Sequence, residues 1–284
     1  MHEQAVIFPN RAGEKLVGVY HPAASDSPRA AIVMLHGWSG TRCGPHQMLT
    51  RAARRFSAGN CATLRFDFAG RGDSEGDTDL ATLSTMQEDA RAAFVFLRAQ
   101  TEAPLLVLGL CSGCEIAVAS VSSDVAGAIL WSAPIFAAPP SQGSASKKRG
   151  VNLRKYARKL LSISTYAKVL RGQIDTKGVS KALAGGGGAA SKNLESNAPG
   201  QLPPGFRRDC LVSWRAFSAP RLQIYGGADP ITESSVEFYR QNSGAEAEII
   251  LIEGANHSFY GLNWEREVFD HTLDWLDNRF YESV

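Results

Sequence analysis

Short runs of apolar and β-branched residues recur along the chain, and most of them end at Gly, Pro or Asp. Runs of about four to eight such residues, bounded by turn-forming residues, predict β-strands. Eight segments fit this description: residues 5–9, 15–20, 30–35, 62–66, 105–108, 126–131, 221–225 and 248–252.

Helical periodicity follows several of the later strands. A capping box formed by Thr85 and Glu88 is expected to begin one helix. Residues 234–241 and 264–280 are also predicted to be helical. Two early strands followed by strand–helix alternation predict an α/β fold, a doubly wound and mostly parallel eight-stranded sheet with helices on both faces. The apolar side chains that share one face of the first helix are Met86, Ala90, Phe94 and Leu97.

One long segment interrupts the alternation. Residues 132–220 separate two predicted strands, although a crossover between parallel strands needs only about a dozen residues. This segment contains a helix-like stretch at 152–171. Because structureless loops of this length are uncommon, we expect a core of residues 1–136 and 219–284, with a helical lid or cap inserted at 137–218.

The inserted segment is strongly basic. Residues 146–181 include eleven Lys or Arg and one Asp, whereas the whole chain has a formal net charge of only +2. A basic amphipathic helix can attract an anionic substrate, lie on anionic lipid at a membrane surface, or simply face solvent, and the sequence leaves all three open. The candidate substrate contacts in this lid are Arg154, Lys155, Arg158 and Lys159.

The overall composition is that of a globular protein, with 44% hydrophobic and 20% charged residues. A net charge this close to neutral does not indicate nucleic-acid binding. The first ten residues lack the apolar stretch of a signal peptide, and no run of about 18 apolar residues suggests a transmembrane segment. We therefore expect a cytoplasmic location, with peripheral membrane contact only through the basic lid.

Five cysteines occur, an odd number without a double pair of zinc-type spacing. This pattern favours free thiols in a reducing compartment, and it predicts neither a metal nor another cofactor. Cys111 and Cys114 do form a C-x-x-C, which can support redox chemistry or metal binding. Cys111 also belongs to a second motif, which explains it better.

That motif is Gly109-Leu110-Cys111-Ser112-Gly113, and it directly follows the predicted strand 105–108. It fits Gly-x-nucleophile-x-Gly, in which a strand turns sharply into a helix and holds the nucleophile at a strained tip. Side chains two residues before and after the nucleophile would collide there, so both positions favour Gly. The N-terminus of the helix expected at 112–121 would also stabilise a thiolate.

Ser112 is the alternative nucleophile, but that register would put Leu110 and Cys114 at the two glycine positions. With Cys111 as the nucleophile, the backbone N–H of Ser112 becomes an expected donor to the oxyanion of the reaction. A tight strand–helix turn around a buried cysteine would be the purely structural explanation of the motif.

A second oxyanion donor is expected from the turn His36-Gly37-Trp38, which follows the strand 30–35. The backbone N–H of Trp38 is the candidate, since two such N–H groups aimed at a developing oxyanion lower the barrier by several kcal/mol. His36 comes too early in the chain to be the catalytic base, so it is expected to brace this turn. The sequence Arg71-Gly72-Asp73 ends another strand and is interpreted as a structural turn.

Asp229 is the candidate acid and His257 the candidate base, and each follows one of the last two predicted strands. The order nucleophile, acid, base is that of hydrolases with parallel sheets, whose sites lie at the carboxyl ends of the strands. His257 would take the thiol proton, and Asp229 would orient the imidazole. Glu253 is a weaker candidate for the acid. The remaining histidines are interpreted as surface or packing residues: His2, His21, His46 and His271.

Five motifs occur in order: the His-Gly turn at 36–37, the Gly-rich turn at 70–72, the elbow at 109–113, the Gly-Gly-Ala-Asp-Pro turn at 226–230 and the loop that carries His257. Together they resemble the α/β-hydrolase superfamily from about residue 3 to the end, the insertion excepted. A cysteine at the elbow departs from the usual serine and resembles the dienelactone-hydrolase type. Gly109-Leu110-Cys111 and the basic lid helix are also similar to hydrolases associated with the bacterial exosortase and exopolysaccharide system. These resemblances imply a cytoplasmic bacterial hydrolase.

The expected activity is hydrolysis of a carboxylic ester or thioester through an acyl-cysteine intermediate. The substrate would be a small molecule or a carrier-linked acyl group, and the basic lid would favour an anionic one. An acyltransferase that uses the same triad and a catalytically silent binding or scaffold protein on the same fold are the alternatives. The sequence leaves the acyl group, the leaving group and the oligomeric state open.

Overall fold

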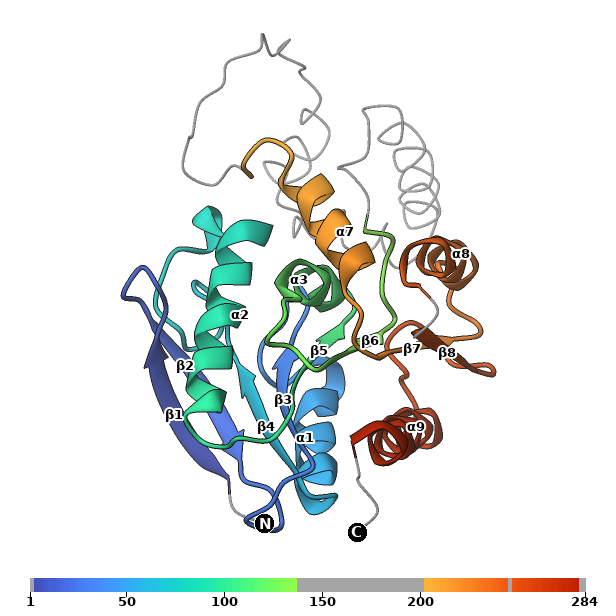
Figure 1. The fold of residues 1–284 in the computed structure, drawn as a ribbon, viewed down its shortest axis with the longest axis horizontal. Coiled ribbons are helices and arrows are strands. Elements are labelled where there is room, and N and C mark those ends of the chain that lie inside the picture. Colours follow the sequence, from blue (N-terminus) through green and yellow to red (C-terminus); the bar gives the residue numbers. More distant parts are fainter. Residues whose placement is uncertain (1–2, 137–201, 245–246, 281–284) are drawn as a thin grey trace, which may run out of the picture. The chain divides into compact units, whose positions relative to one another are not determined.

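The computed structural model describes residues 3–136, 202–244 and 247–280 (Figure 1). Most of the predicted lid lies outside these residues, and so do its four candidate substrate contacts, Arg154, Lys155, Arg158 and Lys159.

The described residues form an eight-stranded sheet in the order β1-β2-β4-β3-β5-β6-β7-β8. The β1–β2 and β2–β4 pairs are antiparallel, and all other neighbours are parallel. The predicted α/β fold class is thereby confirmed. The strands are β1 (Gln4–Pro9), β2 (Lys15–His21), β3 (Ala30–Leu35), β4 (Cys61–Phe66), β5 (Leu105–Leu110), β6 (Gly127–Trp131), β7 (Arg221–Gly226) and β8 (Ala247–Ile252).

Helices cover both faces of the sheet (Figure 1). On one face, α1 (Met48–Ala58) packs on β4, and α9 (Leu262–Phe280) packs on β7, β8 and α1. The other face carries α2 (Leu83–Arg98), α3 (Gly113–Ser120), α7 (Phe206–Ala216) and α8 (Thr232–Asn242). Two 3₁₀ turns complete the described elements, η1 (Pro45–Gln47) and η2 (Thr78–Leu80).

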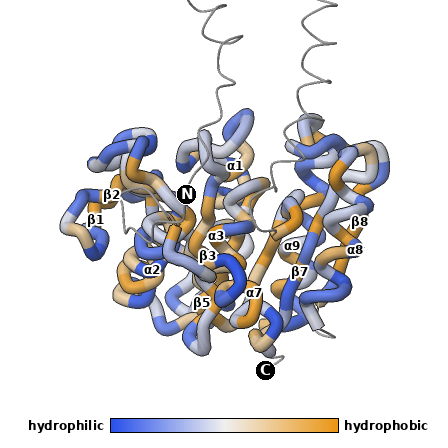
Figure 2. The backbone as a smooth tube through the Cα atoms, turned by 90° about the horizontal axis from the view of Figure 1, so that it is seen from above, coloured by the Kyte–Doolittle hydropathy of each residue, from blue (hydrophilic) through white to orange (hydrophobic). Residues whose placement is uncertain are grey.

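The central strands are apolar on both sides because both sides are covered. In β3, Ala31, Val33 and Leu35 contribute to the core under α2 and α3. The alternate residues Ile32 and Met34 contribute to the core under α1 and α9. Figure 2 shows the hydrophobic central strands between more polar helices. Continuous burial explains why apolar runs were enough to locate these strands.

Two helix starts differ from the sequence expectation. The N-cap of α2 is Thr82, whose hydroxyl accepts a hydrogen bond from the N–H of Thr85 at 3.1 Å. The Thr85 hydroxyl accepts one from the N–H of Thr82 at 2.8 Å, so the predicted pairing of Thr85 with Glu88 is wrong. Helix α1 had no predicted counterpart, because its N-cap, Gln47, makes no side-chain capping bond.

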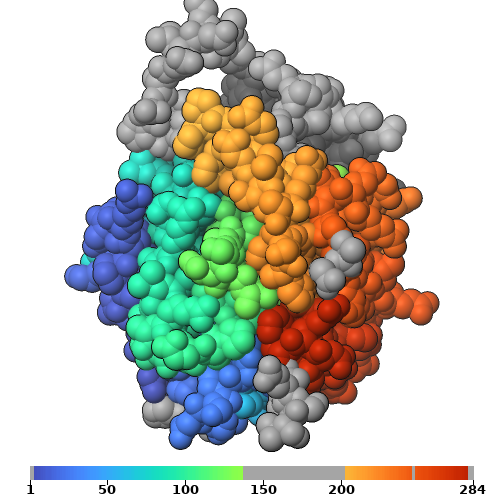
Figure 3. All heavy atoms as spheres, in the orientation of Figure 1, coloured from blue at the N-terminus to red at the C-terminus, as the bar shows by residue number. Residues whose placement is uncertain are grey.

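Helix α7 falls within the residues assigned to the insertion, yet it packs against α3 and α8 in the same compact unit as the sheet (Figure 3). Its Trp214 is fully buried, and the guanidinium of Arg221 lies 4.8 Å above the indole ring. Because buried aromatic area contributes strongly to stability, this face ties residues 206–216 to the core.

The parallel register brings four strand ends to one edge of the sheet. Leu35 pairs with Gly109, and Leu110 pairs with Trp131. Gly226 pairs with Ile252. The loops that follow β3, β5, β7 and β8 therefore meet at this edge, where sites of open parallel sheets form.

Candidate active site

Cys111 lies at the sharp bend between β5 and α3, with a left-handed backbone φ of 56°. A Cβ at Gly109 would lie 2.6 Å from the Cα of Cys114, and one at Gly113 would collide with the carbonyl oxygen of Leu35. Only glycine fits both positions, and a non-glycine residue with this φ is strained. Since Ser112 has an ordinary helical φ of −64°, the bend is built around Cys111.

The structure brings the three candidate residues together. His257 Nε2 lies 3.0 Å from Cys111 Sγ, and His257 Nδ1 lies 2.6 Å from Asp229 Oδ2. Asp229 is buried, whereas the side chain of His257 is 35% exposed. Glu253 is solvent-exposed, and the position behind the imidazole is taken by Asp229. The arrangement resembles a nucleophile–base–acid triad in its distances.

A close approach of two loops aligns Asp229 with His257. The N–H of Ala228 donates to the carbonyl of Ala255 at 2.9 Å, and the N–H of Gly227 donates to that of Ile252 at 2.8 Å. A Cβ at Gly226 would lie 2.6 Å from the carbonyl oxygen of Asn256. Glycine at this position therefore lets the loop after β7 pack directly on the loop after β8.

The charges of the pair favour a thiolate next to an imidazolium. Burial acts to raise the pKa of the Cys111 thiol, but the hydrogen bond and charge of His257 and hydrogen bonds from Ser112 hold it below its ordinary value. The hydrogen bond with Cys111, opposed by burial and aided by Asp229, raises the pKa of His257 to about 9. The N-terminus of α3 adds a favourable dipole.

Cys114 has a different environment from Cys111. Its thiol is fully buried and donates a hydrogen bond to the carbonyl of Gly109 at 3.1 Å. Burial raises its pKa well above the ordinary value. Both cysteines are free, so the C-x-x-C spacing joins one accessible thiol to one packing residue rather than two reactive thiols. Among the described residues, no group of three or more His, Cys, Asp or Glu could hold a metal ion.

The turn after β3 lies beside the elbow. His36 is buried and accepts a 3.5 Å hydrogen bond from the N–H of Phe68, while its Nδ1 lies 2.7 Å from the carbonyl of Gly37. Burial lowers the pKa of His36, so the ring is a neutral brace for the turn. The N–H of Trp38, the expected oxyanion donor, donates to Ser112 Oγ at 2.9 Å.

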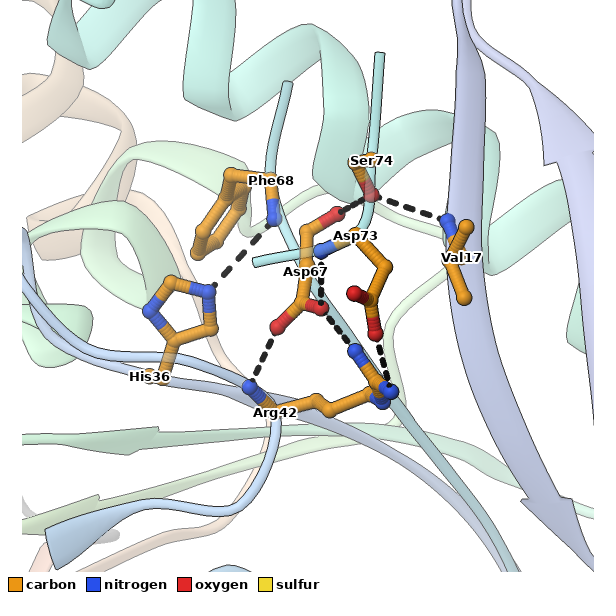
Figure 4. Close-up of polar contacts among 7 residues, drawn as sticks. All are labelled: Val17, His36, Arg42, Asp67, Phe68, Asp73 and Ser74. Carbon is orange, nitrogen blue, oxygen red and sulfur yellow. Dashed lines mark hydrogen bonds and ion pairs between the residues drawn. The ribbon is translucent and has the colours of Figure 1, made fainter. Parts of the chain in front are cut away.

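Asp67 anchors the Gly-rich turn after β4 to the same region (Figure 4). Its carboxylate is buried and accepts hydrogen bonds from the backbone N–H and the guanidinium of Arg42. Arg42 also pairs with Asp73 at 2.6 Å, and Ser74 Oγ bridges the Asp67 carbonyl and the N–H of Val17. The end of β4 and the loop after β3 are thus joined through one buried carboxylate.

The Arg-Gly-Asp sequence has structural contacts here. The Nε–H of Arg71 donates to the carbonyl of Trp38 at 2.8 Å, and Asp73 pairs with Arg42. Gly72 has a φ of 51°, and a Cβ there would collide with the carboxylate of Asp67. The motif is therefore a structural turn that holds the peptide of Trp38.

Comparison with known proteins is consistent with this architecture. A family model described as the alpha/beta hydrolase family matches residues 32–270. The chain belongs to the α/β-hydrolase family. No curated protein matches this hydrolase. Among solved structures, the esterase domain of a Rhodothermus marinus protein is similar, with 18% identity, a TM-score of 0.63, and coverage of 99% of this chain and 100% of that one.

Two further solved structures share the fold of this hydrolase. The Pyrococcus furiosus esterase Pf2001 has 19% identity and a TM-score of 0.65, covering 99% of this chain and 92% of its own. Est1E from Butyrivibrio proteoclasticus, solved with ferulic acid, has 15% identity and a TM-score of 0.62, covering 97% and 99%. At such low identity these likenesses show the fold alone. Among the described residues of the hydrolase, no helix is long and apolar enough to cross a membrane.

In the structure of this hydrolase, His46 has contacts near His257 that the sequence did not predict. His46 Nε2 lies 2.9 Å from the carbonyl oxygen of Ser258, the residue after His257. Its Nδ1 lies 3.1 Å from Arg51 Nη2, and Arg51 forms two 2.5 Å hydrogen bonds with the buried Glu265. The ring of His46 therefore bridges the loop after β8 and the Arg51–Glu265 pair.

The backbone at His46 is unusual as well, because His46 and Gln47 have φ values of 40° and 65°. Left-handed residues of this kind persist only where surrounding contacts hold them. His46 was interpreted as a surface or packing residue, since its partner is 212 positions away and no local motif joins them. We infer that it positions the loop that carries His257.

Replacing His46 with alanine is expected to slow alkylation of Cys111 by iodoacetamide about tenfold at pH 7, because small displacements of a reacting group are costly. The pH midpoint of alkylation should rise as His257 loses its fixed place. His46→Gln, which keeps an N–H donor, should recover most of the rate. His271→Ala is the matched control and should behave like the wild type. An unchanged rate and midpoint in His46→Ala would contradict the positioning role.

Proposed function

We propose that this hydrolase cleaves a carboxylic ester or thioester through an acyl-cysteine intermediate on Cys111. The supporting observation is the alignment of Cys111 Sγ, the two ring nitrogens of His257 and Asp229, with distances of 3.0 and 2.6 Å. A thiolate that is already paired with an imidazolium is a strong nucleophile next to its own proton donor.

In the first half-reaction, the Cys111 thiolate attacks the carbonyl carbon of the substrate and forms a C–S bond, while the carbonyl electrons move to oxygen. The backbone N–H of Ser112 faces the resulting oxyanion. The tetrahedral intermediate then collapses, the bond to the alkoxide or thiolate leaving group breaks, and His257 Nε2–H gives its proton to that group.

In the second half-reaction, water replaces the leaving group. His257 takes a proton from the water as its oxygen attacks the acyl-cysteine carbonyl. The C–S bond then breaks, which releases the carboxylic acid and restores the thiolate–imidazolium pair. The imidazole is 35% exposed, so water can approach it. Asp229 keeps Nδ1 as the protonated nitrogen throughout.

Ester and thioester substrates suit this nucleophile. A thiolate leaves readily and an alkoxide leaves with the proton that His257 supplies, whereas an amide nitrogen is a poorer leaving group than either. The structural neighbours from Rhodothermus marinus and Pyrococcus furiosus are named as esterases, which agrees with this choice. Transfer of the acyl group to another acceptor would use the same intermediate.

A separate proposal concerns the part of the substrate that the lid would bind, and it rests on the sequence of the lid. Eleven basic residues between positions 146 and 181 would attract an anionic or carrier-linked acyl group. Reversal of four charges, at Arg154, Lys155, Arg158 and Lys159, should raise KM for an anionic acyl-thioester and reduce its salt dependence. A neutral ester such as p-nitrophenyl acetate is the control, and its KM should stay unchanged.

The deciding experiment measures alkylation of Cys111 as a function of pH, beside a panel of acyl esters and acyl-thioesters. Because the thiol pKa is lowered, reaction with iodoacetamide should persist below the pH at which a free thiol, with a pKa near ~8.5, becomes protonated. The rate should fall only as the pH drops through the lowered thiol pKa. It should not fall above about pH 9, where His257 loses its proton and the thiolate remains.

Mass spectrometry of the alkylated peptide separates Cys111 from the other thiols. Burial raises the pKa of Cys61 to about 11 and also raises those of Cys114 and Cys210, so these should react slowly. Slow, unselective labelling together with no turnover of any ester would favour the scaffold alternative. Product analysis in the presence of added alcohols or thiols distinguishes hydrolysis from acyl transfer.

A further inference from the structure

The side chain of Ser112 stands between the two expected oxyanion donors. Its Oγ accepts the backbone N–H of Trp38 at 2.9 Å, so this N–H is already occupied. A Cβ at Gly37 would lie only 2.9 Å from Ser112 Oγ, which shows that glycine at 37 leaves the room that the hydroxyl fills. The sequence predicted only the backbone of Ser112 in this role.

The hydrogen of this hydroxyl remains available. Because Oγ accepts from Trp38, its own O–H must point elsewhere, and a hydroxyl rotates freely to suit an acceptor. Cys111 is the preceding residue in the chain, and hydrogen bonding from both the backbone N–H and the hydroxyl of Ser112 acts to lower the pKa of its thiol. Among residues 3–136, 202–244 and 247–280, Ser112 Oγ takes part only in the hydrogen bond from Trp38, so its O–H is free to turn toward Sγ or toward a bound substrate.

The peptide of Trp38 cannot shift easily when negative charge develops on the substrate oxygen. Its carbonyl is held by the guanidinium of Arg71 at 2.8 Å, and its indole Nε1 lies 3.5 Å from Glu115 Oε2. Glu115 is itself paired with Arg207 at 3.3 Å. The Trp38 peptide is thus clamped on both sides, whereas the O–H of Ser112 turns about a single bond.

We propose that the hydroxyl of Ser112 is a catalytic group, donating to the Cys111 thiolate at rest and to the substrate oxyanion in the tetrahedral intermediate, while the N–H of Trp38 polarises it from behind. This inference rests on the proposed acyl-cysteine function. The proton stays on Oγ throughout, and the O–H changes only the acceptor to which it donates. Hydrogen bonds in series strengthen one another, so the fixed N–H of Trp38 makes the hydroxyl a better donor.

The arrangement also explains why two donors can lie on one residue. The oxyanion forms on the carbon bonded to Sγ, next to the backbone N–H of Ser112. A hydroxyl on the Cβ of the same residue can reach the same oxygen. If Trp38 were instead the direct donor, Ser112 would have to give up its 2.9 Å hydrogen bond and swing out of the hole at every turnover.

Ser112→Ala and Ser112→Thr, assayed on p-nitrophenyl acetate, test the proposal. Loss of one oxyanion donor typically costs about 10²-fold or more in kcat, so Ser112→Ala should lose about that much while KM changes little. The pH midpoint of Cys111 alkylation should rise in the same variant. Ser112→Thr keeps the hydroxyl and should restore kcat to within about threefold and the midpoint to the wild-type value.

Ser120→Ala is the matched control, because Ser120 is a buried serine on the same helix whose hydroxyl has no hydrogen-bond partner. It should leave kcat and the midpoint unchanged, and thermal unfolding confirms that each variant is folded. An equal or higher kcat in Ser112→Ala would identify the hydroxyl as a plug and overturn the proposal, as would a threonine variant as slow as the alanine one. A wild-type protein without turnover or selective alkylation would instead refute the acyl-cysteine function itself.

Discussion

Cys111→Ala is expected to reduce ester and thioester hydrolysis by about 10⁴-fold or more, the scale of loss when a triad nucleophile is removed. Cys111 lies at the strained tip of the elbow, and its Sγ is 3.0 Å from His257 Nε2. The same variant should lose the fast, selective phase of iodoacetamide labelling. Steady-state hydrolysis of p-nitrophenyl acetate and peptide mass spectrometry provide the two measurements.

Cys111→Ser gives the complementary result. A serine hydroxyl carries its proton at neutral pH, so the resting thiolate–imidazolium pair is lost. Its shorter side-chain bond also withdraws the nucleophile from the substrate, and we expect kcat at least about a hundredfold below the wild type. Cys43→Ser, which changes a half-buried thiol outside the triad, should leave kcat intact. Wild-type turnover in Cys111→Ala would place the nucleophile elsewhere and end the acyl-cysteine mechanism.

Asp229→Asn is expected to lower kcat by about 10³- to 10⁴-fold with little change in the fold. Asp229 Oδ2 lies 2.6 Å from His257 Nδ1, and its Oδ1 accepts the N–H of Ile231 at 3.2 Å. An asparagine can satisfy only one of these two donors. If its NH₂ group faces His257, the imidazole must carry its proton on Nε2 and cannot accept the proton of Cys111.

The pH dependence should change in the same direction. The hydrogen bond and charge of Asp229 help raise the pKa of His257 to about 9, so their loss lowers that pKa and weakens the pair. The alkylation midpoint of Cys111 should therefore move to higher pH in Asp229→Asn. Glu253→Gln is the matched control, since Glu253 is exposed, and it should keep the wild-type kcat and midpoint. If Glu253→Gln lost most of its kcat while Asp229→Asn stayed active, Glu253 and not Asp229 would be the acid that orients His257.

Cys111→Ala and Asp229→Asn change the two ends of the hydrogen-bonded series Cys111, His257 and Asp229, so their effects on kcat should not add. Once the thiol of Cys111 is absent, the orientation of His257 no longer matters to the reaction. The double variant should therefore be about as slow as Cys111→Ala alone. In the roles proposed for them, His46 acts on the same triad through the carbonyl of Ser258 and Ser112 acts through the thiolate.

Strand positions were predictable because the physics that sets them is local. Each central strand is buried on both faces, so a continuous apolar run marks it, and the predicted and observed limits of the strand Ala30–Leu35 coincide. Helix Met48–Ala58 was not predictable in this way, because it begins after two left-handed residues, His46 and Gln47, without a side-chain cap. Instead, the backbone N–H groups of Leu49 and Thr50 at its start donate to the carbonyl of Cys43.

The elbow and the order of the candidate triad could also be read from the chain. Glycine at 109 and 113 is required by the close approach of backbone atoms. A glycine two residues before and after the nucleophile can therefore be recognised in the sequence. Asp229 and His257 could be selected because they follow consecutive strands. Their catalytic roles stay a prediction until the variants above are measured.

The sequence by itself determined the α/β sheet, the bend at Cys111 and which loops carry Asp229 and His257, because continuous apolar runs, paired glycines and the order of the strands are all visible along the chain. Only the tertiary structure decided that Ser112 Oγ caps Trp38, that His46 holds Ser258, and that Asp67 ties Arg42 to the Gly-rich turn. Each of these hydrogen bonds joins segments distant in sequence. Their geometry exists only after the sheet has set its register, and no local pattern encodes it.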